Sequence, residues 1–400
     1  MKVALLSSGL IPLPPTKGGA VEEYVFQLSR HLRKLGVEAV AIDFTFSDSD
    51  VGLHEISGSL ILKVKVSKID RAPKKRILQE LVFGLKASEI LEELDVIHAN
   101  TAWAGFAVAT KLKNKSLVYS CHNPLWPEEK VHVSEHVVRL VEGLTMRRSN
   151  AIIALNKTMM RAIVEKARVD PQKIFVVPNG VNTEFFKPGI PADDVARRYG
   201  LEGRRVVLFV GRVTYAKGVH LLLKAFKELI TSYRDLKLVI AGPLSDHFGE
   251  EEPSPYAKIL MNYAEKNLPR DSYIFTGAVD RDTLRKLYSL AYVCVLSSYA
   301  EAFPMVLIEA MASGCPVIGS NAGGVVDVID EGITGFIFRK GDYMDLKEKM
   351  KFLLGDEALR KVLSINCREV AEKRYSWEAI ALKLKNVYES INPTTIENSS

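Results

Sequence analysis

Short runs of aliphatic and β-branched residues alternate with segments of helical periodicity along the whole chain, and this alternation limits the fold more than any other feature. Runs of this kind are typical of buried strands. The strand candidates are VALL (3–6), VEAVAIDF (37–44), VIHA (96–99), LVYSC (117–121), AIIAL (151–155), VVLFVG (206–211), LKLVIAG (236–242), YIFTG (273–277), YVCVLSS (292–298) and PVIGS (316–320). Strands that alternate with helices form parallel sheets covered by crossover helices, so we expect an α/β fold.

The length of the chain predicts two domains, because 400 residues exceed what one ordinary hydrophobic core accommodates. The segment FFKPGIPADDVARRYGLEGRR (185–205) interrupts the alternation with two prolines and many charges. We therefore expect an N-terminal domain over 1–185 and a second domain over 186–375.

One more helix is expected over 376–392. Five apolar residues recur there at intervals of three and four behind a Ser376 N-cap: Trp377, Ile380, Leu384, Val387 and Ile391. A helix with one apolar stripe needs a surface to cover. The last residues, PTTIENSS (393–400), are expected to be disordered.

The composition, 47% hydrophobic and 26% charged, is that of a globular protein. No apolar run is long enough to span a bilayer, and the first 15 residues read as a strand and a loop rather than a signal peptide. Four scattered cysteines without a C-x-x-C pair indicate reduced thiols, with neither a disulfide framework nor a zinc site. These features favour a cytoplasmic protein.

The net charge of +6 comes entirely from the first half of the chain. Residues 1–190 hold 26 Lys and Arg against 20 Asp and Glu, and residues 191–400 hold 28 of each. Part of the excess lies in KVKVSKIDRAPKKR (63–76), which is either a solvated face or a peripheral contact with an anionic membrane or substrate. No aromatic residues interleave with the basic ones, so no nucleic-acid partner is expected.

Two acids, Glu301 and Glu309, lie in the otherwise apolar stretch SSYAEAFPMVLIEAMASG (297–314). Pro304 suits the first turn of a helix, so a strand should end near 298 and a helix should follow from about 304 to 313. Glu301 then lies at the carboxyl end of a parallel strand, where open α/β sheets bind ligands. The helix start should offer free amides to an anion, namely those of Met305, Val306 and Leu307.

A second loop has matching chemistry. The strand before Gly211 is followed by Arg212, and Lys217 and Gly218 come just before the next helical segment. An arginine can fork across two phosphate oxygens and a lysine adds a point charge, so these cations could hold a diphosphate without a metal ion.

Several motifs of the sequence resemble those of a known family. The segments VPNGVN (177–182), GRVTYAKG (211–218), TGAVD (276–280) and EAFPMVLIEAMASGCPVIGSNAGG (301–324) are similar to glycosyltransferase family 4, the retaining nucleotide-sugar transferases of GT-B fold. The resemblance also includes TKGGAVEEYV (16–25), DVIHAN (95–100), YSCHN (119–123) and YSWEAIALKL (375–384). It implies two Rossmann-like domains that face each other across a cleft, with the last helix crossing back to the first domain.

The resemblance also implies roles for individual residues. Arg212 and Lys217 would hold the donor diphosphate, Glu309 the ribose hydroxyls and Glu301 the sugar. His122 matches the histidine near the reacting carbon. Further substrate-binding positions are Phe303 with the neighbouring amides of Met305, Val306 and Leu307, then Gly277 and Val279 beside the base, and the backbone of Gly18 and Gly19 near the sugar and phosphates.

The implied reaction moves a hexosyl group from a UDP- or GDP-hexose to an acceptor hydroxyl on a glycan, lipid or small molecule. The leaving phosphate would take the acceptor proton on the same face of the sugar, with no metal and no cofactor. Asn100 and Asn123 stand where the family often has His or Asp, which leaves the acceptor open.

The sequence also allows three alternatives to this function. A non-catalytic nucleotide-sugar sensor or scaffold of the same fold is the main alternative, although retention of Arg212, Lys217, Glu301 and Glu309 argues against it. A metal-dependent transferase would use the D-x-D triplet Asp48-Ser49-Asp50, which lies in a polar loop. A dehydrogenase would need a G-x-G-x-x-G after the first strand, and the sequence has none there.

Overall fold

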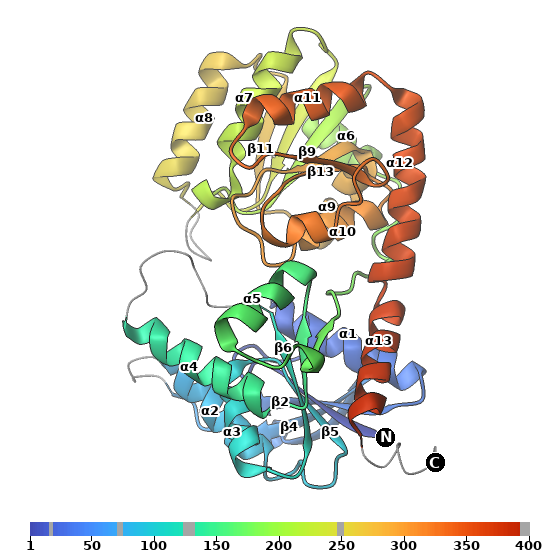
Figure 1. Cartoon of the computed structure of the whole chain (residues 1–400). Coiled ribbons are helices and arrows are strands. Elements are labelled where there is room, and N and C mark those ends of the chain that lie inside the picture. Colours follow the sequence, from blue (N-terminus) through green and yellow to red (C-terminus); the bar gives the residue numbers. More distant parts are fainter. Residues whose placement is uncertain (16–18, 70–74, 123–132, 246–251, 393–400) are drawn as a thin grey trace. The chain divides into compact units, whose positions relative to one another are not determined.

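The computed structural model describes residues 1–15, 19–69, 75–122, 133–245 and 252–392, without the side chains of 133–136. These residues form two compact units (Figure 1). Unit 1 comprises Met1–Gly180 and Trp377–Ser400, and unit 2 comprises Val181–Ser376. The first boundary therefore lies five residues before the expected one at 185/186. The segment 393–400, expected to be disordered, is outside the described residues.

Unit 1 contains an eight-stranded sheet in the order β3-β4-β2-β1-β5-β6-β7-β8. Neighbouring strands are parallel except in the β3–β4 hairpin. The strands are β1 (Lys2–Leu6), β2 (Glu38–Thr45), β3 (Gly52–Ile56), β4 (Ser59–Lys65), β5 (Val96–Ala99), β6 (Ser116–Cys121), β7 (Ala151–Ala154) and β8 (Ile174–Val176). Its helices are α1 (Ala20–Lys34), α2 (Lys75–Ala87), α3 (Ala102–Lys111), α4 (Val133–Arg148), α5 (Lys157–Ala167) and α13 (Trp377–Ile391).

Unit 2 contains a six-stranded parallel sheet in the order β11-β10-β9-β12-β13-β14. The strands are β9 (Arg205–Val210), β10 (Leu236–Ala241), β11 (Tyr273–Gly277), β12 (Ala291–Leu296), β13 (Val317–Ser320) and β14 (Gly335–Phe338). Its helices are α6 (Asp193–Tyr199), α7 (Val219–Ile230), α8 (Pro255–Asn267), α9 (Arg281–Leu290), α10 (Met305–Ala312), α11 (Tyr343–Leu354) and α12 (Glu357–Val370). Among the described residues, no helix has both the length and the apolar character needed to cross a bilayer.

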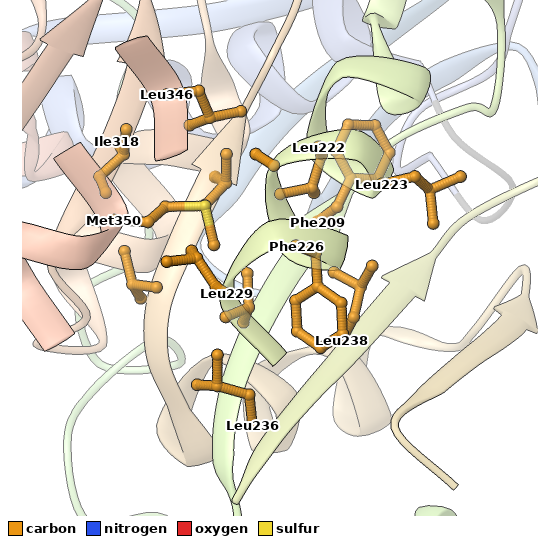
Figure 2. Close-up of a cluster of buried hydrophobic side chains, with 14 of the residues drawn as sticks. Phe209, Leu222, Leu223, Phe226, Leu229, Leu236, Leu238, Ile318, Leu346 and Met350 are labelled. Carbon is orange, nitrogen blue, oxygen red and sulfur yellow. The ribbon is translucent and has the colours of Figure 1, made fainter. Parts of the chain in front are cut away.

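The core of unit 2 forms where α7 packs on the sheet. Figure 2 shows side chains of α7, including Leu222, Phe226 and Leu229, beside strand residues such as Phe209 and Leu238. Leu346 and Met350 of α11 extend the same cluster. The apolar spacing of α7 turns one side of that helix to the sheet.

The apolar stripe of α13 packs into the core of unit 1, as the resemblance implied. Trp377, Ile380, Leu384 and Val387 are buried there beside α1, and Ile391 packs at the edge of the same cluster. Figure 1 shows α13 alongside α1. The phenol of Tyr388 on α13 also lies 2.6 Å from Nδ1 of His98, a fully buried residue of β5. The C-terminal helix is therefore part of the first fold unit, although 196 residues of unit 2 (181–376) separate it from Gly180.

Replacing Leu384 by alanine should destabilise unit 1 by about 2–5 kcal/mol, because a fully buried leucine would leave a cavity. Leu382 lies on the same helix but is 50% exposed, so Leu382→Ala is the matched control and should change the free energy of unfolding by less than about 0.5 kcal/mol. Chemical denaturation of both variants measures the difference. Equal effects would show that the stripe does not hold α13 on unit 1.

Candidate functional site

The site in unit 2 lies where the strand order reverses. From β9 the chain proceeds to β10 and β11 on one side, and then returns to β12 on the other side of β9. The loops that follow β9 and β12 therefore lie next to each other at the carboxyl edge of the sheet, the usual ligand-binding position of such sheets. Two hydrogen bonds join the loops: Tyr299 N donates to Ala216 O at 2.7 Å, and Ser297 Oγ donates to Lys217 O at 3.0 Å.

Glu301 forms an ion pair with Lys217 across these two loops. Ser298 Oγ also donates to Glu301 Oε1, at 2.7 Å. The side chain of Glu301 is only 10% exposed and that of Lys217 is 30% exposed, so these partners replace the water that the carboxylate loses on burial. The structure thus brings together two residues that lie 84 positions apart in the chain. A lysine ammonium has three donors, so this contact leaves others for a ligand.

The backbone packs closely around this ion pair. Gly218 has φ +62° and Gly323 has φ +50°, both in the left-handed region that favours glycine. A Cβ at Gly218 would overlap the carbonyl oxygen of Ser297, and a Cβ at Gly323 would overlap that of Glu301. Gly218 therefore allows the two loops that carry the charges to touch, and Gly323 allows the segment after β13 to pack against the backbone of Glu301.

Glu309 lies on α10, beyond the loop that carries Glu301. Tyr288 of α9 donates a hydrogen bond to Glu309 Oε2 at 3.0 Å. Burial of Tyr288, and next the nearby Glu309 charge, raise the pKa of the phenol well above its usual value, so Tyr288 remains a donor. This contact holds the carboxylate of Glu309 in one place on the helix.

The helix start differs from the expectation in one respect. Pro304 is the N-cap and α10 begins at Met305, one residue later than predicted. The amide of Met305 donates to Phe303 O at 3.1 Å and that of Leu307 donates to Pro304 O at 3.0 Å. The prediction that all three amides are free is therefore wrong for these two, because the turn before the helix uses them; Val306 stays a candidate.

The other predicted residues of unit 2 have different positions around the same edge. Arg212 directly follows Gly211 at the end of β9. Gly277 ends β11 and its carbonyl accepts from Gly242 N at 2.9 Å, while Val279 is half-buried two residues later. The ring of Phe303 is buried, edge-to-face with Tyr375 at 6.3 Å between centroids. Its side chain therefore serves packing in this structure.

Unit 1 carries the remaining predicted residues. Gly18 lies outside the described residues, and Gly19 is the N-cap of α1. His122 follows β6 and is partly buried, with Nε2 2.9 Å from Oδ1 of Asn100. Removal from water lowers the pKa of His122 to about 4, so the ring is uncharged at neutral pH.

Several polar residues at these edges were not predicted. In unit 1, buried Glu22 accepts a hydrogen bond from Ser8, and buried Asp43 accepts from Ser7 Oγ at 2.9 Å and from Leu13 N at 2.7 Å. The signal for Asp43 was present, because it is one acid inside an apolar strand. No sequence pattern singles out Tyr288, whose partner Glu309 lies on another helix, or Ser298, whose partner Glu301 lies three residues later in the same loop.

The D-x-D triplet has structural partners. Asp50 pairs with Lys63 at 2.8 Å, and Asp48 pairs with Lys65. Over the part of the chain that the structure describes, no group of three or more His, Cys, Asp or Glu residues is arranged to hold a metal ion. The same two pairs neutralise part of the basic run in 63–76, of which 70–74 are outside the described residues.

The two sheet units and their switch-point site define a protein of the GT-B class, and comparisons with known proteins agree. Residues 18–185 match the model of glycosyltransferase family 4, and residues 193–370 match the model of the glycosyl transferases group 1. The chain therefore belongs to glycosyltransferase family 4 and is a glycosyltransferase. Family membership therefore disfavours the non-catalytic alternative.

Relatives of known name are similar over almost their whole length. Spore coat protein SA of Bacillus subtilis is 27% identical over 405 residues, which cover 97% of this chain and 99% of the relative. The lipopolysaccharide 1,2-N-acetylglucosaminetransferase of Salmonella typhimurium is 26% identical, with coverage of 96% and 97%.

Solved structures share the fold. A sucrose-phosphate synthase from Thermosynechococcus elongatus superposes with a TM-score of 0.77 at 22% identity, over 98% of this chain and 99% of the other. HepE of Anabaena, in complex with UDP, gives a TM-score of 0.75 at 21% identity, over 98% and 100%.

Replacing Gly218 by alanine should destabilise unit 2 and separate the two loops, because the added methyl meets the backbone of Ser297. Gly203 is the matched control: its φ is +67°, but its Cβ would meet nothing within 4 Å. Gly203→Ala should cost only the left-handed strain of about 1–2 kcal/mol. Gly218→Ala should cost more in chemical denaturation; equal losses would mean that the close approach is unimportant.

Proposed function

We propose that this glycosyltransferase moves a hexosyl group from a nucleoside-diphosphate hexose to an acceptor hydroxyl, with retention of configuration and without a metal ion. The observation that carries the proposal is the contact between Lys217 and Glu301 at the switch point, with Arg212 on the same loop. Cations and a carboxylate at one edge suit a substrate with a charged diphosphate at one end and sugar hydroxyls at the other.

In this proposal the two cations act on the leaving group. Cleavage of the bond between the sugar and the diphosphate places negative charge on phosphate oxygens. Lys217 is held by Glu301 and by the loop contact to Ser297, so its charge is in place before the bond breaks. Fixed positive groups of this kind stabilise the charge as it develops. Arg212 would take the remaining oxygens.

Glu301 and Glu309 would bind the two hydroxyl-bearing parts of the donor. Glu309 is fixed by Tyr288 on the helix after the loop and would accept from the ribose hydroxyls. Glu301 accepts hydrogen bonds from Lys217 and Ser298, and it would also accept hydrogen bonds from hydroxyls of the transferred sugar. The UDP and UDP-glucose complexes of the similar HepE structures favour a UDP-hexose as donor, with a GDP-hexose second.

Retention is proposed to follow from same-face attack. A double displacement would need a carboxylate able to reach the anomeric carbon. The buried acids Glu22 and Asp43 at the edge of unit 1 already accept hydrogen bonds from Ser8, Ser7 and Leu13. In the proposed route the leaving phosphate takes the acceptor proton, so no side-chain nucleophile is needed. The acceptor class, and the peripheral contact with an anionic membrane, stay predictions.

Lys217→Ala should lower turnover of a UDP-hexose by at least about a hundredfold, the scale of losing a fixed charge at the leaving group. Lys349 is the matched control, because it pairs with Glu331 at 3.0 Å and is 31% exposed, like Lys217. Lys349→Ala should keep its activity. The assay is run in excess EDTA: activity that appears only with added Mg²⁺ or Mn²⁺, or a fully active Lys217→Ala, contradicts the proposal.

The two acids should separate in calorimetry with free UDP. Glu309→Gln should weaken UDP binding, because the ribose loses its acceptor. Glu301→Gln should bind UDP nearly as wild type but turn over the sugar donor slowly, since UDP has no sugar for it to contact. The opposite pattern would reverse the two roles.

A further inference from the structure

Three strand ends meet at the carboxyl edge of unit 1. Leu6 ends β1, Asn100 follows β5, and His122 follows β6. In the sheet β5 lies between β1 and β6, so Asn100 is the middle residue of the three. Its side chain is buried, with the residue 3% exposed, and its amide group contacts both neighbours.

The amide of Asn100 can have only one orientation here. Its Nδ2 donates to the carbonyl oxygen of Leu6 at 2.9 Å. Rotating the amide by half a turn would put two acceptor oxygens against each other in a buried place, which is costly. Oδ1 is therefore the atom that faces His122, and it lies 2.9 Å from Nε2. An amide oxygen only accepts, so Nε2 must carry the proton.

We propose that Asn100 is a positioning residue that sets the tautomer of His122, with the proton on Nε2 and the lone pair on Nδ1. The backbone carbonyl of Leu6 determines the amide orientation, and the amide orientation determines the tautomer. His122 is also held in place by the ring of Tyr24, which lies edge-on with centroids 4.8 Å apart.

The tautomer decides what His122 can bind. An uncharged ring with a lone pair on Nδ1 accepts a hydrogen bond from a hydroxyl and cannot donate one from that atom to a phosphate oxygen. This step rests on the proposed function: Asn100 makes His122 a hydrogen-bond acceptor for hydroxyls of the substrate. The other histidine of this edge is different, because both nitrogens of His98 already have partners, Tyr388 and Ser120.

The test is ¹⁵N NMR of the whole chain labelled at histidine, with His122→Gln used to assign the His122 signals. At neutral pH we expect Nε2 of His122 to be protonated and Nδ1 to show the shift of an unprotonated nitrogen, as a single tautomer. In Asn100→Leu, which keeps the size but offers no acceptor, the signals should change to a mixture with protonated Nδ1. Ser120→Ala, on β6 two residues before His122, is the matched control and should alter the His98 signals while those of His122 stay as in wild type.

These spectra need no substrate, so they test the tautomer independently of the proposed function. Wild-type His122 with protonated Nδ1, or a folded Asn100→Leu that keeps the single Nε2–H tautomer, overturns the proposal. If Asn100→Leu does not fold, the wild-type spectrum still decides, because a mixture of tautomers there overturns it as well.

Kinetics with the donor test whether the tautomer matters for turnover. Asn100→Leu should lower kcat/KM about tenfold, and should add almost nothing in the His122→Gln background, since residues that act through each other are not additive. Additive losses overturn the positioning role. A wild type that turns over no UDP- or GDP-hexose contradicts the proposed function, while the spectra decide on Asn100 alone.

Discussion

Parallel pairing of strands is the constraint on which the site depends, because it places every loop that follows a strand at one edge of its sheet. In unit 2 this edge collects the loop after β9, with Lys217, and the loop after β12, with Glu301, although the two residues are far apart in the chain. In unit 1 the same rule collects Leu6, Asn100 and His122. The strand order reverses at β1 in unit 1 and at β9 in unit 2. At each reversal, the loops after two neighbouring strands lie side by side although those strands do not follow each other in the chain.

Buried polar groups at such an edge need hydrogen-bond or ion-pair partners, and these partners differ between the two units. Unit 2 pairs opposite charges and then brings the backbone close, with Gly218 packed against Ser297. Unit 1 uses neutral or partly shielded contacts: Asn100 between Leu6 and His122, and Asp43 beneath the loop that contains Leu13. Burial raises the pKa of Asp43 to about 6.

The sequence predicted the features that have a period or a motif. All ten expected strand runs became strands, since each is continuous and apolar, and the stripe of α13 fixed which side of that helix is buried. Of the strands in the described part of the chain, four were missed. The β3–β4 hairpin was missed because its strands mix exposed and buried residues, as at Leu53, and β8 because it has three residues; β14 was missed as well. Contacts such as Tyr288 with Glu309 follow from the packing of two helices, which no spacing in the chain encodes. Whether the amides of Met305 and Leu307 are free depends on the geometry of the turn before the helix, which a proline alone does not specify.

The division of unit 1 also bears on how the protein is made. The strands of unit 1 leave the ribosome first, but α13 follows only after the 196 residues of unit 2 (181–376). At about 5–20 residues per second, this delay is about 10–40 s. During that time the surface that Trp377, Leu384 and Tyr388 later bury has no helix over it. Unit 2 is continuous and can complete its core within the same interval. The unit whose synthesis begins second is therefore the first that can finish folding, and the nascent chain must stay soluble with an apolar face uncovered until α13 emerges.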